Sequence, residues 1–259
     1  MWQSLRPLRT AGLQRPGISL YSYRPRAPTR RLAWQSLIAV SPIILNFHGV
    51  GLVPRNIDEG ERNCWLEQDS FEAVLDLARE QSHVQLTFDD GNASDVEIVL
   101  PALLRRGMRA AFFLCSGRLD QPGFLSRKQV RELLSNGMPI GSHGVAHRSW
   151  RKLNPEQLSI ELEGSRRVLE TVCGIPVDTA ACPFGAYDRT VLSGLRRAGY
   201  RSVFTSDGGA SSENQWLRAR TTVTRSMPSE KIQSLVRFGS TFWKQCSIDF
   251  RKLLKRLRG

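Results

Sequence analysis

The feature that most limits how this chain can fold is a repeated alternation of short apolar runs with helix-forming segments, beginning near Leu32. Capping-box patterns open two of the helices, pairing Ser126 with Gln129 and Asn154 with Gln157. About seven β/α units in about 200 residues predict a mostly parallel sheet with helices outside it, either a barrel or a doubly wound sheet. The runs predicted as strands cover residues 43–47, 84–88, 110–114, 138–142, 179–182, 202–205 and 220–224.

Positive charge is concentrated at the two ends of the chain. Residues 1–31 hold seven arginines and no acid, and residues 241–259 hold six Lys or Arg against one acid. Together they carry twelve of the thirteen net positive charges, so the central part is nearly neutral. Basic tails add weak attraction to polyanions or to an anionic membrane surface. Because no recognition motif accompanies the charge, we expect no specific nucleic-acid binding.

These patterns divide the chain into three predicted parts. Residues 1–31 form an Arg-rich leader whose prolines oppose a long amphipathic helix, so we expect disorder, with an organelle-targeting peptide as the alternative. Residues 32–240 form a single α/β domain. Residues 241–259 space their apolar side chains by three and four, as a basic amphipathic helix does.

The cysteines and the hydropathy bear on the compartment. Five cysteines without a CxxC pair argue against a disulfide framework and favour a reducing environment. No window of the sequence approaches the roughly 20 apolar residues of a membrane span. We therefore expect a cytoplasmic protein, with peripheral membrane contact through the basic tails as an open alternative. The oligomeric state is not predicted.

Polar residues stand directly after four of the predicted strands. His48 follows the first, Asp89 and Asp90 follow the second, and His143 follows the fourth, while Pro183-Phe184-Gly185 follows the fifth. In β/α folds the carboxyl ends of parallel strands open on one face, where active sites are built. Four separate segments are therefore predicted to converge on one place.

The segment SHGVAH places His143 and His147 four residues apart. Either one helical turn or a loop after a strand could point both imidazoles at one metal ion. The zinc-protease pattern HExxH does not apply, because Gly144 stands where that pattern needs its glutamate base. Two neighbouring histidines are also common as ordinary surface or core residues. One further ligand would complete three protein ligands with a position open for water, as in catalytic zinc sites.

The doublet Asp89-Asp90 could supply that ligand. Adjacent residues at a strand end point in different directions, so one carboxylate could bind a metal while the other faces the reacting water. An Asp-Gly pair is equally typical of a simple turn. The doublet alone therefore fits both interpretations.

Together LTFDDG, SHGVAH and CPFGAYD, in this order, resemble the polysaccharide deacetylase family, carbohydrate esterase family four, which includes the nodulation-type chitooligosaccharide deacetylases. The resemblance covers roughly residues 42–225. It implies a single-domain distorted (β/α) barrel of about seven units. It further implies a divalent metal, most often Zn²⁺, and removal of acetyl groups, chiefly N-acetyl, from an oligo- or polysaccharide. Under this resemblance Asp90, His143 and His147 would be metal ligands, Asp89 the general base, and the backbone N–H near Phe184 an oxyanion donor.

The sequence departs from the common family pattern at three positions. No histidine follows His147 to serve as the late acid, Ala181 stands where an arginine is usual, and Gly144 replaces a Ser or Thr. His48 matches the acid histidine of relatives that resemble biofilm poly-N-acetylglucosamine deacetylases. We expect His48 to be the acid, with a structural histidine as the alternative. These departures keep a second hypothesis open, a catalytically weakened carbohydrate-binding relative.

Four further residues are predicted to have structural roles. Arg220 resembles the arginine of a late family strand, and a structural ion pair is expected for it. Trp65, Trp150 and Trp216 could stack on sugar rings, but scattered tryptophans more often belong to the core or lie partly buried at the surface.

Overall fold

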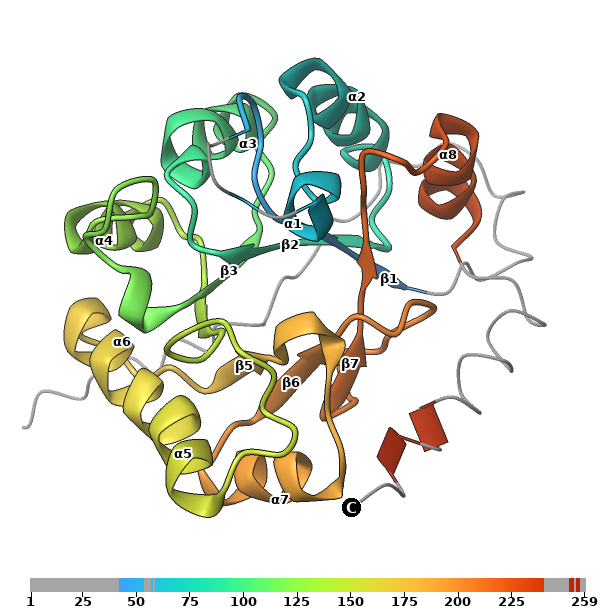
Figure 1. Cartoon of the computed structure of the whole chain (residues 1–259). Coiled ribbons are helices and arrows are strands. Elements are labelled where there is room, and N and C mark those ends of the chain that lie inside the picture. Colours follow the sequence, from blue (N-terminus) through green and yellow to red (C-terminus); the bar gives the residue numbers. More distant parts are fainter. Residues whose placement is uncertain (1–41, 54–56, 58, 240–251, 254, 257–259) are drawn as a thin grey trace, which may run out of the picture. The chain divides into compact units, whose positions relative to one another are not determined.

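The computed structural model describes residues 42–53, 57, 59–239, 252–253 and 255–256. In this part of the chain eight parallel strands form one sheet, in the order β7-β6-β5-β4-β3-β2-β1-β8. Figure 1 shows the helices arranged around the outside of the strands. The strands are β1 Ile43–Phe47, β2 Val84–Asp90, β3 Ala111–Leu114, β4 Ile140–Ser142, β5 Thr179–Ala181, β6 Ser202–Thr205, β7 Leu217–Ala219 and β8 Thr221–Thr222.

The barrel is closed by its last two strands, which only Arg220 separates. β7 pairs with β6 and β8 pairs with β1, so the two act as one interrupted strand in a ring of seven. The predicted distorted (β/α) barrel is therefore confirmed. The predicted bounds 220–224 of this last strand are wrong, because the strand begins at Leu217 and is interrupted at Arg220. The predicted strand 138–142 is likewise shorter, beginning at Ile140.

The helices begin where the capping patterns predicted. The Ser126 side chain accepts a hydrogen bond from the Gln129 N–H, and that of Asn154 accepts one from the Gln157 N–H. A wider π-helical turn, η3 Ile160–Gly164, joins α5 to α6. The helices are α1 Glu59–Asn63, α2 Gln68–Ala78, α3 Leu100–Arg105, α4 Arg127–Ser135, α5 Pro155–Ser159, α6 Ser165–Cys173, α7 Arg189–Arg197 and α8 Ser229–Phe238, with another π-helical turn, η1 Asp95–Val99, before α3 and short 3₁₀ turns at Ser116–Arg118 and Pro183–Gly185.

The buried residues form separate apolar clusters. The largest lies between helices and sheet and includes Phe47, Phe88 and Phe112, whose rings stack with centroids 5.2 and 5.0 Å apart. A small cluster that includes Phe113 and Phe204 packs beneath the Arg220 guanidinium, 5.2 and 5.9 Å from the two ring centroids. Successive strand residues point to opposite faces, so the barrel interior is filled by alternate residues of the strands.

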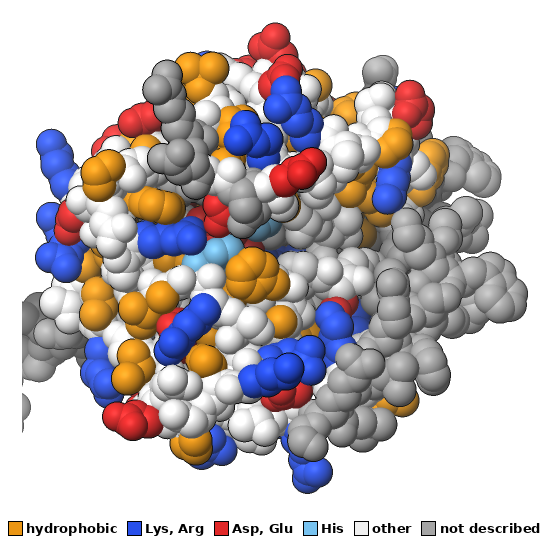
Figure 2. All heavy atoms as spheres, in the orientation of Figure 1, with side chains coloured by type: hydrophobic (Ala, Val, Ile, Leu, Met, Phe, Trp, Pro, Cys, Tyr) orange, Lys and Arg blue, Asp and Glu red, His pale blue; other side chains and the backbone are white. Residues whose placement is uncertain are grey.

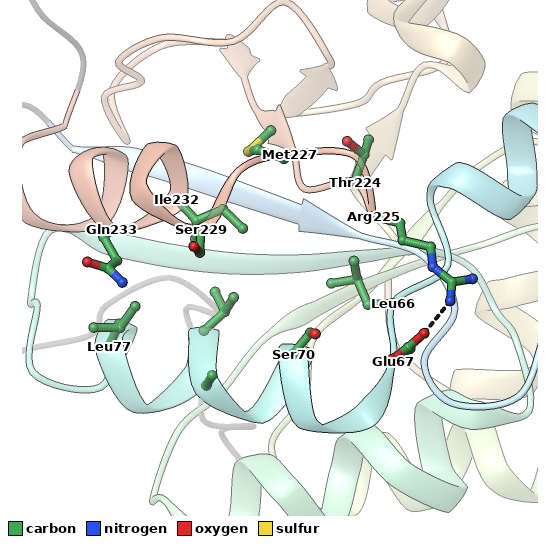
Figure 3. Close-up of a pocket in the computed structure, with 12 residues that line it drawn as sticks. Leu66, Glu67, Ser70, Leu77, Thr224, Arg225, Met227, Ser229, Ile232 and Gln233 are labelled. Carbon is green, nitrogen blue, oxygen red and sulfur yellow. Dashed lines mark hydrogen bonds and ion pairs between the residues drawn. The ribbon is translucent and has the colours of Figure 1, made fainter.

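A groove of about 400 Å³ runs along α2 and α8, outside the barrel (Figure 3). An ion pair between Arg225 and Glu67 lies at one end of it. None of the residues that line the groove is one of the polar strand-end residues. This groove is therefore separate from the chemistry predicted from the sequence. The lining residues are Leu66, Glu67, Ser70, Ala73, Val74, Leu77, Thr224, Arg225, Met227, Ser229, Ile232 and Gln233.

Some predictions concern residues that the structure does not describe. The leader 1–31 and most of the helix predicted for 241–259 are outside the described residues, and the three-part division stays a prediction. Within the described residues, none of the helices combines the length and apolar character that crossing a membrane requires. Trp65 and Trp150 are buried in the domain and Trp216 is partly buried, as expected of structural tryptophans.

Candidate active site

Three side chains from two strand ends and one loop meet at the carboxyl end of the barrel. One possible ligand atom from each of Asp90, His143 and His147 lies within 4.8 Å of the other two. The Asp90 Oδ1 is 3.2 Å from Nε2 of His147 and 3.7 Å from Nε2 of His143. Figure 2 shows histidine side chains near the middle of the face viewed, among basic and hydrophobic groups.

Asp90 adopts a backbone conformation that turns the chain sharply out of β2. Its φ is 81° and that of Gly91 is 77°, in the left-handed region that side chains other than glycine seldom adopt. Among the described residues, Asp90, His147 and Phe184 are three of five non-glycine residues with positive φ. Such conformations cost roughly 1–3 kcal/mol each and gather at functional sites. Here these three residues lie in the segments that converge on the candidate site.

His143 is held in a fixed tautomer. Its Nδ1 lies 2.9 Å from the Ala181 carbonyl oxygen, which can only accept, so Nδ1 carries the proton. The lone pair is then on Nε2, which faces Asp90. Burial lowers the His143 pKa to about 4, although the charges of Asp89 and Asp90 oppose this shift. At neutral pH the imidazole is therefore uncharged, the form that binds a metal.

The segment between the two histidines is a loop, so the helical alternative for SHGVAH is wrong. The Glu161 carboxylate organises this loop from η3, accepting hydrogen bonds from Val145 N–H at 2.7 Å and from Arg148 Nε at 2.8 Å. Gly144 has a φ of 82°, and a Cβ there would lie 2.5 Å from Glu161 Oε2. A larger residue here would have a strained backbone and would displace the Glu161 carboxylate.

Glu161 was not among the residues that the sequence singled out. It is 1% exposed. Its position three residues after Leu158, on the inward stripe of the helix, was the available signal, because an acid on a buried stripe needs partners. The partners are supplied by the loop, which follows an earlier strand.

Asp89 is fixed by a bidentate ion pair with Arg220. Both guanidinium nitrogens donate to its carboxylate at 2.7 Å, and Asn46 Nδ2 donates to Oδ2 at 3.0 Å. Burial alone would raise the Asp89 pKa, but the charges of Arg220 and His143 outweigh it and hold the pKa below its usual range. The structural ion pair expected for Arg220 is confirmed, and its partner is the first acid of the doublet.

Two buried polar side chains extend this network below Asp89. Thr87 Oγ1 donates to Asn46 Oδ1 at 2.8 Å, and Arg220 Nη1 reaches the same oxygen at 2.9 Å. Asn46 was not among the predicted site residues, although a lone asparagine in the apolar run IILNF was a usable signal. Its position on β1 beside β2 places its amide next to Asp89.

His48 and Phe184 lie at the edges of this cluster. His48 is partly buried, and its charge is close enough to lower the pKa of Asp89. Its buried Nδ1 has no hydrogen-bond partner among the described residues. The Phe184 ring is exposed, and its centroid lies 4.6 Å from that of His147. Both residues therefore flank the three clustered side chains.

The donor set of the cluster fits a divalent metal. Two imidazoles and one carboxylate are the ligands of many catalytic zinc sites. Asp90 Oδ1 is buried and accepts no hydrogen bond within the described part of the chain, although two imidazole nitrogens face it and Arg118 Nη1 lies 3.7 Å away. A metal ion held by the two imidazoles would satisfy this oxygen directly, which the Arg118 guanidinium at that distance does not.

Comparison with known proteins agrees with this geometry. The family model for polysaccharide deacetylases matches residues 76–203. YxkH of Bacillus subtilis is 25% identical over 162 residues, covering 62% of this chain and 58% of that protein. A chitooligosaccharide deacetylase of Azorhizobium caulinodans is 26% identical over 130 residues, covering 49% of this chain and 60% of that protein. The matched regions thus span about three fifths of each of these two relatives.

Solved structures share the fold. A polysaccharide deacetylase from Bacillus cereus superimposes with a TM-score of 0.67 at 19% identity, covering 76% of this chain and 69% of that one. The Streptococcus pyogenes deacetylase PplD gives a TM-score of 0.67 at 20% identity, covering 78% and 99%. The likeness to these structures shows that the barrel fold is shared. The chain carries a polysaccharide deacetylase domain, which the family model matches over residues 76–203.

Proposed function

We propose that this protein is a metal-dependent hydrolase that removes acetyl groups, chiefly N-acetyl, from an oligo- or polysaccharide. The observation that carries the proposal is the cluster of Asp90, His143 and His147 beside the ion-paired Asp89. Two nitrogen ligands and one carboxylate leave coordination positions open, as hydrolysis requires. The names of the relatives, which include deacetylases acting on chitooligosaccharides and peptidoglycan, agree with this substrate class.

Asp90, His143 and His147 would hold the metal, with Zn²⁺ the expected ion. When bound there, a divalent metal supplies Lewis acidity, which polarises the acetyl carbonyl and makes water more acidic near neutral pH. His143 is suited to this task because its Nδ1–H is engaged by the Ala181 carbonyl, which orients the ring.

Asp89 would accept the proton of the attacking water. The water oxygen forms a bond to the acetyl carbon while its proton passes to the Asp89 carboxylate. Asp89 Oδ2 accepts from both Arg220 and Asn46, whereas Oδ1 accepts from Arg220 alone, so one of the carboxylate's about four acceptor positions, on Oδ1, remains for the water. The N–H near Phe184 would stabilise the charge that develops on the carbonyl oxygen.

His48 would donate a proton to the departing nitrogen. The C–N bond then breaks, releasing acetate and leaving a free amine on the sugar, so the water is fully accounted for. His48 follows β1 and Asp89 ends the neighbouring β2, so acid and base come from different strands. This arrangement lets the two groups act on opposite sides of one scissile bond.

A second candidate, a weakened carbohydrate-binding relative, is favoured by one observation, the absence of any histidine after His147. Acetate release separates the two. Chitooligosaccharides, poly-N-acetylglucosamine and acetylated xylan should be assayed with and without a chelator. Chelator-sensitive release supports the hydrolase. Sugar binding without release from any substrate, in protein shown to contain metal, supports the weakened relative.

We place the protein in the cytoplasm because its cysteines indicate a reducing environment. Within the described residues, the thiols of Cys115, Cys173 and Cys182 are not joined in disulfides. Weak contact of the basic tails with polyanions is part of the same proposal.

A further inference from the structure

A second charged site lies beside the cluster, where β6 ends. The Asp207 side chain is 5% exposed, and its Oδ2 accepts hydrogen bonds from Tyr187 OH at 2.9 Å and from Thr205 Oγ1 at 2.8 Å. Its Oδ1 is 2.5 Å from Lys255 Nζ. The two neutral donors orient the carboxylate through Oδ2, and Oδ1 pairs with the Lys255 ammonium.

The Lys255 ammonium has three kinds of partner in this site. Besides Asp207, it donates to the Gly185 carbonyl oxygen at 3.2 Å and lies 5.2 Å from the centroid of the Tyr187 ring. A carboxylate, a carbonyl and an aromatic face together are the groups that recognise a primary ammonium. We call Asp207, Tyr187 and Gly185 the ammonium site.

The ammonium site borders the candidate active site. Gly185 is adjacent to Phe184, whose ring contacts His147. The Thr205 carbonyl accepts hydrogen bonds from the backbone N–H and Nε of Arg220, at 3.0 and 3.2 Å, and Arg220 in turn holds Asp89.

Because Gly185 of the ammonium site adjoins Phe184 at the cluster, a sugar chain that places one acetyl group at the cluster would have a neighbouring unit near Asp207.

We propose that the ammonium site binds the amine of an already deacetylated glucosamine unit that neighbours the acetylated unit, and that Lys255 fills this position when no such sugar is bound. The inference rests on the proposed function, because the product of N-deacetylation is a primary ammonium on a sugar ring. An N-acetyl group is neutral and cannot replace the Lys255 charge. The preferred substrate would then be a partly deacetylated polymer.

Binding of a fully deacetylated glucosamine trimer tests the inference without turnover, because this probe carries no acetyl group. Its affinity should be measured by calorimetry at pH 6 and low salt for the full chain and three variants. These are Lys255→Met, the double variant Lys255→Met/Asp207→Asn, and Lys231→Met, which removes a charge from exposed α8. Thermal melting of each variant checks that it is folded.

We expect Lys255→Met to bind the trimer about tenfold more tightly, since it removes the internal competitor. Adding Asp207→Asn should reverse this gain, whereas Lys231→Met should match the unmodified protein. Increasing salt should weaken the gain. A gain of affinity cannot arise from loss of folding, so the Lys255 result stands even if the double variant is unstable.

Equal trimer affinity in the unmodified protein and in Lys255→Met would overturn the inference. Acetate release from acetylated chitooligosaccharides, measured in parallel on the same protein, reports separately on the proposed function. Release without Asp207-dependent trimer binding would refute the ammonium site alone. Asp207-dependent binding without any release would instead refute the hydrolase while supporting the site.

Discussion

Arg220 and Asp89 meet inside the barrel through two parallel hydrogen bonds, Nη1 to Oδ1 and Nη2 to Oδ2, each 2.7 Å long. Arg220 stands at the interruption between β7 and β8, where the barrel closes. Arg220, which links the two strands that close the barrel, therefore also orients the proposed base, Asp89. The family resemblance led us to expect an arginine at the position of Ala181, and here the guanidinium comes instead from Arg220, between β7 and β8.

Arg220→Met should shift the acidic limb of the kcat/KM pH profile upward. Burial raises the Asp89 pKa, and without the guanidinium that opposes it the carboxylate would protonate at higher pH. Unpairing a buried charge should also reduce the free energy of unfolding by about 3–5 kcal/mol. The pH profile and urea unfolding measure the two effects. Arg220→Lys should shift the profile less, because it keeps the charge but loses the bidentate geometry. An unchanged acidic limb in Arg220→Met would show that the ion pair with Arg220 does not set the pKa of the catalytic base.

Removing either candidate histidine ligand should lower metal content and acetate release together. His143→Ala and His147→Ala each delete one of three ligands, so bound zinc, measured by elemental analysis after dialysis, should fall well below one equivalent. His83→Ala is the matched control, because His83 lies before β2, outside the cluster, and should keep both. Full activity of the chelated, metal-free protein would contradict the metal assignment, whatever the variants do.

Glu161→Gln should weaken metal binding although Glu161 is not a ligand. Its carboxylate holds the loop between the two histidines through Val145 and Arg148. Residues that orient metal ligands without binding the metal themselves typically contribute 10–100-fold to metal affinity. A competitive zinc titration measures the loss. Glu163→Gln, on the same helical turn and half exposed, should leave the affinity unchanged. If both variants bind zinc like the unmodified protein, the loop does not depend on this carboxylate.

Much of the fold follows from local sequence. The apolar runs at 43–47 and 202–205 match β1 and β6 in full, because buried parallel strands leave near-continuous hydrophobic segments. The bounds of the last strand were predicted wrongly because the strand is interrupted at Arg220, whose side chain pairs with Asp89. The two residues are far apart in the sequence, so no local pattern encodes this contact.

The candidate site was only partly predictable for a related reason. Asp89, Asp90 and His143 stand at strand ends, where topology alone brings them together. Glu161 and Asn46 lie within a helical turn and a strand, and their partners come from segments far away in the sequence. A polar residue in an apolar pattern predicts that its side chain is buried and hydrogen-bonded, but the sequence does not show which partner it binds.

Asp95 should give the metal-free protein a distinct pH dependence. Burial first, and then the charges of Asp90 and Asp89, raise its pKa well above the usual value. Its contribution to the free energy of unfolding is therefore complete below the unfolded-state pKa of about 3.9 and is lost as pH rises toward the folded-state pKa. Asp95→Asn cannot ionise, so its stability relative to the unmodified protein should rise above pH 4, by at most about 1.4 kcal/mol per pH unit.

Urea unfolding between pH 4 and 8, with chelator present, measures this difference. Asp69→Asn, at an exposed position of α2, is the matched control for removal of a carboxylate. A constant difference for Asp95→Asn across this range would mean that Asp95 is ionised in the folded protein.

His48→Ala should retain zinc but lose roughly 100-fold or more in amide hydrolysis, the scale of a removed general acid. The charge of His48 already acts on Asp89, so the ring lies within electrostatic reach of the proposed base. Its buried Nδ1 has no hydrogen-bond partner among the described residues. A departing amine needs a proton more than a departing alcohol does. An acetyl ester should therefore lose less rate than the amide in the same variant, whereas equal losses on both, or loss of zinc from His48→Ala, would assign His48 to the structure of the site and not to proton donation.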